Sequence, residues 1–200
     1  MKILYSPASP YSNKVRMAAH YAGLSAESVL TDTNANPPSL IDSNPLGKIP
    51  TLITEDGRSI YDSRAILHFV DRESKGKLYP RNPAKRTDVE VLEALCDGIC
   101  DSICDSLLAI VYEKRFHPPE KVHQPWIDRH WEKAERGLDY LNANLPKTAA
   151  KLHAGHFALA AMLTYLELRF TGEWQKGRPK LKNWPQKFQK AFPDHTQFRT

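Results

Sequence analysis

The chain has 200 residues, enough for one large domain or two small ones with a buried core. Its 28 Lys and Arg against 23 Asp and Glu give a net charge of +5, too small for a dedicated nucleic-acid-binding protein and slightly favourable for small anionic ligands. No uncharged run approaches the ~18 residues needed to cross a bilayer, and residues 1–24 lack the basic flank and apolar stretch of an export signal. We therefore expect a cytoplasmic protein without a membrane or nucleic-acid partner.

The first 78 residues alternate short strand-like runs with helical patterns. The patterns predict strands at 2–5, 28–31, 51–54 and 59–61 and helices at 10–22 and 62–73. Residues 55–58 are typical of a hairpin turn in which Gly57 supplies the positive φ. The order fits a small β-α-β-α-β-β-α unit, whose second helix has no assigned bounds.

The remainder of the chain is predicted to be helical. Prolines at 80 and 83 interrupt any regular element and indicate a linker at 79–84, between an α/β domain at 1–78 and an all-α domain at 85–200. Apolar spacing predicts helices at 84–115, 121–145, 157–170 and 181–192. The segment 157–170 is apolar nearly all round, which is typical of the central helix of a helical bundle.

Three features of the helical part have two interpretations each. Cys96, Cys100 and Cys104 share one helical stripe, where packing or a dimer face is favoured over a metal site, and an odd count fits a reducing compartment. His153 and His156 lack a third ligand, so we predict no metal site. Lys176, Arg178 and the lysines at 180, 182, 187 and 190, interleaved with Trp184 and Phe188, resemble a nucleic-acid surface. More simply, the lysines form the solvent-exposed side of the last helix and the aromatic residues its buried side.

The first candidate site segment is NPLGKIP at residues 44–50. Pro50 stands where a predicted strand starts, a place at which a residue without an N–H disturbs pairing. If the Ile49–Pro50 bond is cis, the N–H and C=O of Ile49 turn outward and can pair with an extended peptide. A trans proline that ends a loop is the alternative.

The second segment, DSRAI at 62–66, opens a helix directly after a strand. The free N–H groups and dipole of a helix N-terminus suit a carboxylate, to which Ser63 adds a hydroxyl donor, and Asp62 can accept from an ammonium. Alternatively, Asp62 is only the helix N-cap.

The third segment is YSPASPY at 5–11, in which Ser9 precedes Pro10 in the usual N-cap and N1 arrangement. Its hydroxyl could instead donate to a bound thiolate. A thiol has a pKa near ~8.5, and lowering it by about two units requires ~2.7 kcal/mol, which a charge-assisted hydrogen bond and a helix dipole can supply. The other hydroxyls of the region are rival donors, namely Tyr5, Ser6, Tyr11 and Ser12.

The three segments, and less specifically 158–170, resemble the bacterial cytosolic glutathione S-transferases of the serine type. The resemblance implies a thioredoxin-like N-terminal domain, an all-helical C-terminal domain and a homodimer. It also implies glutathione as co-substrate, with Ser9 as the catalytic residue at the thiolate. The other implied glutathione contacts are the cysteinyl part at Ile49 and Pro50, the γ-glutamyl group at Asp62 and Ser63, and the glycyl carboxylate near Lys48.

The implied activity is conjugation of the glutathione thiolate to small hydrophobic electrophiles, or reduction of peroxides, as in detoxification. Side chains at 103–112 would hold the second substrate, and Asp101 could reach the glutathione of a partner subunit. Some bacterial classes of the family use a cysteine in the N-terminal motif. This chain has no cysteine there, and Pro10 follows Ser9, so glutathione-dependent disulfide reduction is disfavoured. The alternative is a glutathione-binding or protein-binding module with the same fold and little activity.

One departure from the family pattern concerns the helix at 157–170. The family often begins this helix with a Ser/Thr-x-x-Asp cap, whereas this chain has LHAGH at 152–156. We therefore expect a different cap.

Overall fold

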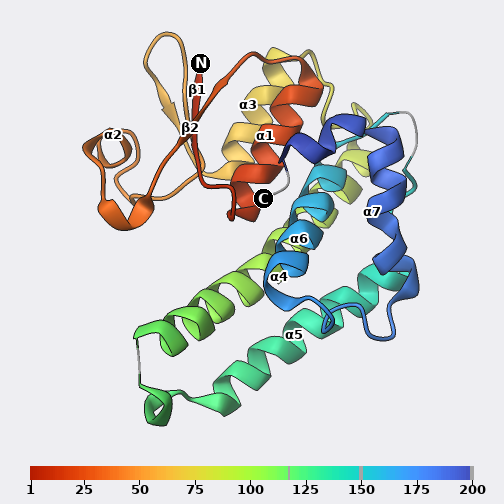
Figure 1. The fold of residues 1–200 in the computed structure, drawn as a ribbon. Coiled ribbons are helices and arrows are strands. Elements are labelled where there is room, and N and C mark those ends of the chain that lie inside the picture. Colours follow the sequence, from red (N-terminus) through yellow and green to blue (C-terminus); the bar gives the residue numbers. More distant parts are fainter. Residues whose placement is uncertain (117, 149–150, 199–200) are drawn as a thin grey trace.

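The computed structural model describes residues 1–116, 118–148 and 151–198, and of residues 101–116 the backbone alone. The N-terminal part contains a four-stranded sheet in the order β2-β1-β3-β4, and the rest is mainly helical (Figure 1). The strands are β1 (Lys2–Tyr5), β2 (Glu27–Leu30), β3 (Thr51–Ile53) and β4 (Ser59–Ile60). The predicted α/β unit followed by an all-helical part is confirmed.

The sheet is mixed. β1 runs parallel to β2 and antiparallel to β3, and β3 pairs antiparallel with β4. The turn between the last two strands has Gly57 at φ 81°, as the hairpin prediction requires. Four strand bounds differ by one residue from the predicted ones: β2 begins one residue earlier, and β2, β3 and β4 each end one residue earlier.

Three helices belong to the sheet-containing part. α1 (Pro10–Ala22) and α3 (Ser63–Glu73) pack against each other on one side of the sheet, and the short α2 (Pro38–Ile41) lies on the other (Figure 1). Ile3 and Leu52 of the sheet are buried against Val15 of α1 and Leu67 of α3 within a single hydrophobic core. A 3₁₀ turn, η1 (Thr33–Ala35), precedes α2.

The helical part consists of α4 (Pro83–Phe116), α5 (Gln124–Ala143), α6 (Ala154–Phe170) and α7 (Pro179–Ala191), with 3₁₀ turns η2 (Pro119–Lys121) and η3 (Pro193–Phe198). α5 starts three residues later than predicted because Pro125 suits the first helical turn and η2 occupies the residues before it. α6 starts three residues earlier than predicted. It packs against α4, α1 and α7, and most of its residues are buried, which confirms the central-helix prediction.

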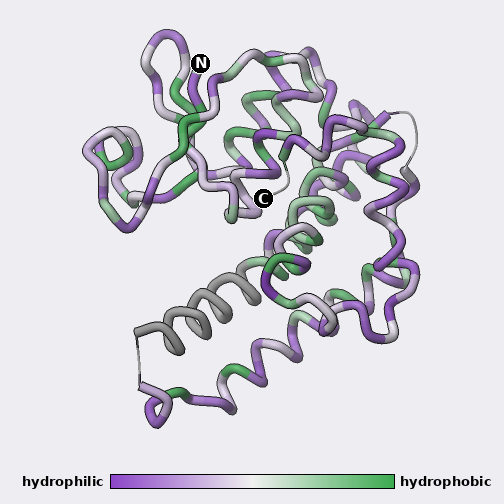
Figure 2. The backbone as a smooth tube through the Cα atoms, in the orientation of Figure 1, coloured by the Kyte–Doolittle hydropathy of each residue, from purple (hydrophilic) through white to green (hydrophobic). Residues whose placement is uncertain are grey.

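α7 separates its polar and apolar residues cleanly. Trp184 and Phe188 are buried, whereas the lysines at 180, 182, 187 and 190 are exposed, and α7 is largely hydrophilic in Figure 2. The prediction that the lysines form the solvent-exposed side of this helix and the aromatic residues its buried side is therefore confirmed. Buried rings cannot stack on nucleic-acid bases.

The cysteines point into the protein where they are described. Cys96 and Cys100 are 1% and 3% exposed, and the side chain of Cys104 lies outside the described residues. Burial, aided by the charge of Asp97, raises the pKa of the Cys96 thiol. Packing is thus the role of the first two cysteines. Within residues 1–116, 118–148 and 151–198, no helix combines the length and apolarity needed to span a membrane.

The segment between α3 and α4 is held by hydrogen bonds at Leu78 and Tyr79. Asp71 Oδ1 of α3 accepts from the N–H groups of Leu78 and Tyr79 at 2.8 and 3.0 Å. The Leu78 carbonyl in turn accepts from the N–H of Ala154, the first residue of α6, at 3.0 Å. The chain therefore leaves α3 along a fixed path toward the helical part.

The N-terminus of α6 has an unusual cap built from two histidines. The N–H of His153 donates to Nδ1 of His156 at 3.1 Å, and Nε2 of His156 lies 3.2 Å from the Lys147 carbonyl oxygen. The His156 ring accepts at one nitrogen and donates at the other, so it is neutral. It takes the place of the acidic residue in a Ser/Thr-x-x-Asp cap.

Both rings are held in their neutral form. Burial lowers the pKa of His156, and burial together with the nearby His156 ring lowers the pKa of His153 to about 3. In the unfolded chain both titrate near ~6.5. Because the unfolded state binds more protons below that pH, their contribution is complete above it and is lost as the pH falls toward the folded pKa.

This cap makes stability dependent on pH. We expect the free energy of unfolding to fall by about 1–2 kcal/mol between about pH 7 and pH 5 through His153 alone. His153→Ser/His156→Gln supplies a capping box that does not titrate in this range and should lose less. Urea unfolding at both pH values measures the difference. His20→Gln, at an exposed site, is the control, and an equal loss in the double variant and the wild type would contradict the assignment.

Candidate functional site

The strand register brings the three sequence segments to one end of the sheet. Leu4 of β1 pairs with Thr51 of β3, and Leu52 of β3 pairs with Ile60 of β4. Both neighbours run antiparallel to β3, so their last residues lie beside its first. The segments that follow β1 and β4, at 5–11 and 61–66, therefore adjoin the segment that precedes β3, at 44–50.

The Ile49–Pro50 peptide bond is cis, as the first segment predicts. Pro50 is buried, and Ile49, two residues before β3, is partly exposed. The Tyr61–Asp62 bond is also cis. Lys48 is exposed, as a contact to a ligand carboxylate requires, while its backbone carbonyl is held within the loop.

Asn44 organises the loop before Pro50 from inside. It is 2% exposed; its Nδ2 donates to the Lys48 carbonyl at 2.9 Å and lies 3.3 Å from Thr51 Oγ1, and its Oδ1 accepts from the Leu46 N–H at 3.0 Å. Thr51 Oγ1 adds a second hydrogen bond to the Lys48 carbonyl at 3.0 Å. The loop is therefore fixed by its own side chains.

Ser9 caps α1 as its sequence context predicts. Its Oγ accepts from the Ser12 N–H at 3.2 Å. Accepting uses a lone pair of the hydroxyl and leaves its proton to donate, so capping and thiolate binding are compatible. Among the rivals, Ser12 is 0% exposed and has no surface for a ligand, and the Tyr5 ring lies 4.0 Å from the Arg16 guanidinium carbon.

Asp62 likewise caps α3, because its Oδ1 accepts from the Arg64 N–H at 3.0 Å. The Asp62 residue is exposed, and Ser63 is 4% exposed at the first helical position. The N-cap interpretation is thus confirmed without removing Asp62 from the site surface. The side chains of Asp101 and of residues 103–112 lie outside the described residues.

A buried charge cluster next to these segments was missed by the sequence analysis. Lys14 of α1 is 1% exposed, and its Nζ lies 3.0 Å from Glu93 Oε1 and 2.9 and 2.8 Å from the two carboxylate oxygens of Asp97, both on α4. Arg64 Nε also donates to Asp97, and the Tyr79 hydroxyl donates to Glu93. We call these five residues the α1–α4 charge cluster.

The cluster is neutral overall and its acidic oxygens are paired. Burial and the charge of Glu93 raise the pKa of Tyr79, which keeps its hydroxyl protonated as a donor. Burial alone would lower the pKa of Arg64, but the hydrogen bond and charge of Asp97, with the charges of Asp62 and Glu93, raise it. One sequence signal was present: Lys14 lies four residues before the buried Ala18, on the packed face of α1.

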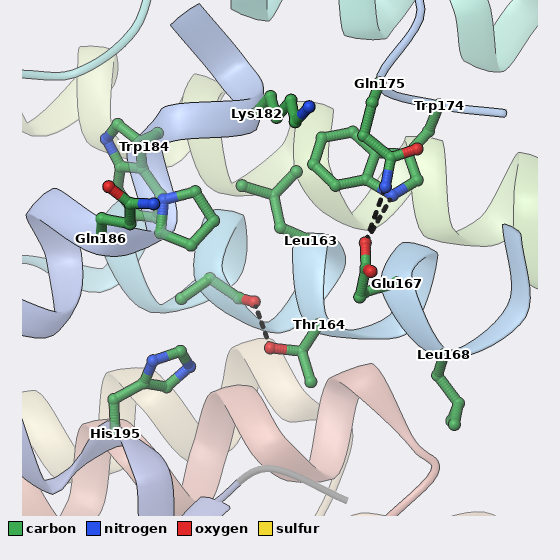
Figure 3. Close-up of a pocket in the computed structure, with 12 residues that line it drawn as sticks. Leu163, Thr164, Glu167, Leu168, Trp174, Gln175, Lys182, Trp184, Gln186 and His195 are labelled. Atoms are coloured by element: carbon green, nitrogen blue, oxygen red, sulfur yellow. Dashed lines mark hydrogen bonds between the residues drawn. The ribbon is translucent and has the colours of Figure 1, made fainter. Parts of the chain in front are cut away.

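A cavity of about 430 Å³ lies away from the three site segments, between α6, α7 and the loop that joins them (Figure 3). Leu163, Trp174 and Trp184 form its apolar walls, and Glu167 accepts from the Trp174 indole and the Gln175 amide. No predicted site residue lines this cavity. Among the described side chains, no group of three or more His, Cys, Asp or Glu could hold a metal ion.

Comparisons with known proteins agree with the geometry. The family model for the glutathione S-transferase N-terminal domain matches residues 4–78, and the model for the C-terminal domain matches residues 124–184. A glutathione S-transferase from Methylobacillus flagellatus KT, solved with glutathione bound, is 33% identical over 97% of this chain and 98% of its own, with a TM-score of 0.83. The chain belongs to the glutathione S-transferase family.

Two further relatives of this family span nearly the whole chain. A glutathione transferase family member from Pseudomonas fluorescens Pf-5, solved with bound glutathione, is 32% identical over 99% of this chain and 98% of its own, with a TM-score of 0.86. The uncharacterized GST-like protein YibF of Escherichia coli strain K12 is 28% identical and covers 90% of both chains. The thioredoxin-like and helical parts implied by the sequence resemblance are therefore confirmed for this member of the family.

The role of Asn44 in this family member can be tested by stability. Asn44→Ala removes the donor to the Lys48 carbonyl and the acceptor for Leu46, and we expect it to lower the free energy of unfolding by about 1–3 kcal/mol. Guanidinium unfolding measures this change. Ser43→Ala, which removes one exposed hydrogen bond to the Ser39 carbonyl, is the matched control. Equal effects of the two changes would contradict the organising role of Asn44.

Proposed function

We propose that the protein is a glutathione transferase that binds glutathione at the end of the sheet where residues 5–11, 44–50 and 61–66 meet. The convergence of these three segments at the start of β3, with a cis bond before Pro50, is the observation that carries the proposal. The glutathione-bound relatives support it, since they cover nearly the whole chain.

Each part of glutathione has a chemically suitable partner in the proposed site. The backbone of Ile49 beside Pro50 pairs with the cysteinyl unit as a strand edge pairs with a peptide. Asp62 faces the ammonium of the γ-glutamyl group, and Ser63 with the N-terminus of α3 faces its carboxylate. Lys48 lies near the glycyl carboxylate as an exposed cation.

The proposed chemistry is nucleophilic attack by the glutathione sulfur. The Ser9 hydroxyl donates a hydrogen bond to the thiolate at the N-terminus of α1, which favours the anion over the thiol. The sulfur then attacks an electrophilic carbon and displaces its leaving group, or attacks a peroxide oxygen and breaks the O–O bond. The protein supplies proximity and stabilisation of the anion.

The domain division, the oligomeric state and the cellular location are part of the same proposal. We place the division between the glutathione-binding domain and the helical domain at residues 79–84, and the second, small hydrophobic substrate between the two domains. The proposed working form is a homodimer in the cytoplasm, with a role in detoxification. Glutathione is a co-substrate, and the proposed chemistry requires no metal.

A direct binding experiment distinguishes the transferase from the alternative module. Titration calorimetry should detect glutathione binding, and ultraviolet absorbance should detect thiolate in the complex at neutral pH. Binding without thiolate would favour a glutathione-binding module with little activity. Absence of binding would overturn both functions.

The hydroxyl of Ser9 should account for a measurable part of the rate. Ser9→Ala should move the pKa of the bound thiol back toward ~8.5 and lower kcat/KM for conjugation about ten- to a hundredfold, the equivalent of one charge-assisted hydrogen bond of about 1.5–3 kcal/mol. Absorbance titration and steady-state kinetics measure the two effects.

Two controls separate the hydroxyl from the cap. Ser9→Gly also removes the hydroxyl but costs only a few tenths of a kcal/mol in capping, so it should lose activity as Ser9→Ala does. Ser6→Ala should retain it. Full activity in Ser9→Gly, or loss in Ser6→Ala alone, would assign the thiolate contact elsewhere.

A further inference from the structure

Ser9 stands at the end of a tight turn that connects β1 to α1. Its N–H donates to the Ser6 carbonyl at 3.1 Å, and Pro7 and Ala8 form the centre of the turn. The central peptide of such a turn can flip over, which changes the backbone angles on either side of it and converts one turn type into another. The carbonyl of that peptide belongs to Pro7. The placement of Ser9 therefore depends on the direction in which the Pro7 carbonyl points.

Asn13 of α1 holds this carbonyl. It is 3% exposed, and its Nδ2 donates to the Pro7 carbonyl oxygen at 2.8 Å. Its backbone N–H also donates to the Ser9 carbonyl at 3.0 Å, which is the regular helical hydrogen bond that a residue of any type with an N–H makes at this position. The bond to Pro7, in contrast, requires a side-chain donor. Asn13 thus contacts the chain on both sides of the Ser9 hydroxyl.

Arg16 determines which end of the Asn13 amide faces the turn. Its Nη1 lies 3.4 Å from Asn13 Oδ1. A guanidinium can only donate and a backbone carbonyl can only accept, so the amide oxygen faces Arg16 and the amide nitrogen faces Pro7. The reverse orientation would place donor against donor on one side and acceptor against acceptor on the other. The cation therefore keeps the amide in the orientation that holds the turn.

Arg16 is itself held by three further contacts. Its Nε donates to Ser28 Oγ of β2 at 3.0 Å. Its guanidinium carbon lies 4.0 Å from the centroid of the Tyr5 ring and 5.2 Å from that of the Phe198 ring. Phe198 belongs to η3, which packs against α1. The guanidinium is therefore fixed by the end of β1, by β2 and by the C-terminal segment of the chain.

We propose that Asn13 is a positioning residue for Ser9, and that Arg16 holds the Asn13 amide in the orientation that this role requires. The inference rests on the proposed role of Ser9 at the glutathione thiolate and adds the side chains that direct its hydroxyl. Asn13 is buried and touches no substrate atom. By holding the Pro7 carbonyl it keeps the turn in one conformation, so that the Ser9 hydroxyl stays directed toward the sulfur while its oxygen caps α1.

The test measures the pKa of the bound glutathione thiol by ultraviolet absorbance and the affinity for S-methylglutathione by titration calorimetry, both on the full chain. Asn13→Leu keeps the approximate volume but cannot donate. It should raise the pKa of the bound thiol by about half a unit or more, the equivalent of a roughly threefold loss of thiolate stabilisation. The affinity for S-methylglutathione, which has no thiol to ionise, should stay close to that of the wild type. A merely structural role would weaken both ligands and leave the thiol pKa unchanged.

Further variants establish that the effect passes through Ser9. Ser9→Ala/Asn13→Leu should have the same thiol pKa as Ser9→Ala alone, because Asn13 acts only through the hydroxyl that both variants lack. Arg16→Lys keeps the charge but loses the planar donor at Asn13, so it should raise the thiol pKa even if Asn13→Leu does not fold. Asn142→Leu is the matched control. Asn142 Oδ1 accepts from the Leu181 N–H at 3.1 Å in the helical part, and its loss should lower stability without moving the thiol pKa.

The outcomes separate this inference from the function on which it rests. An unchanged thiol pKa in folded Asn13→Leu or in Arg16→Lys overturns the inference, as does a double variant whose thiol pKa lies above that of Ser9→Ala. If Ser9→Ala itself leaves the thiol pKa unchanged, the role of Ser9 is wrong and the inference with it, while glutathione binding stands. A wild type that binds no glutathione overturns the proposed function as a whole.

Discussion

The antiparallel pairing of β3 with both of its neighbours is the constraint on which the site depends. β3 has three residues, and its register fixes Thr51 beside Leu4 and Leu52 beside Ile60. The segments around Ser9, Pro50 and Asp62 are far apart in the sequence, and only this pairing brings them to the same end of the sheet. A shift of one residue would turn the buried Leu52 outward and displace the loops that follow β1 and β4.

The local features of the site could be predicted from sequence because each depends on a few adjacent residues. Ser9 before Pro10 specifies a cap, Gly57 specifies a hairpin, and the surroundings of Pro50 indicated the cis bond that is present. α2 received no bounds because it has four residues and therefore too few apolar positions to show a helical period. The α5 start was wrong because η2 extends the proline-rich turn before it.

The charge cluster escaped prediction for a different reason. Glu93 and Asp97 lie 79 and 83 residues after Lys14, and no local pattern connects positions so far apart. A lysine within a helix is normally solvent-exposed, and only its place on the packed face of α1 indicated otherwise. The histidine cap of α6 belongs to the same class, since the departure from the usual cap could be seen but its replacement by a ring nitrogen could not.

The charge cluster also affects how the N-terminal part of the chain packs against the helical part. Apolar side chains of similar volume would fill the same space at no desolvation cost, and such replacements are often neutral or stabilising. Apolar contacts, however, tolerate small rotations and slides between helices, whereas each oxygen of Asp97 has a defined donor. Lys14 from α1 and Arg64 from α3 meet on one carboxylate of α4. The cluster therefore fixes the relative placement of the two helices whose N-termini face the proposed ligand, which apolar packing alone would leave less defined.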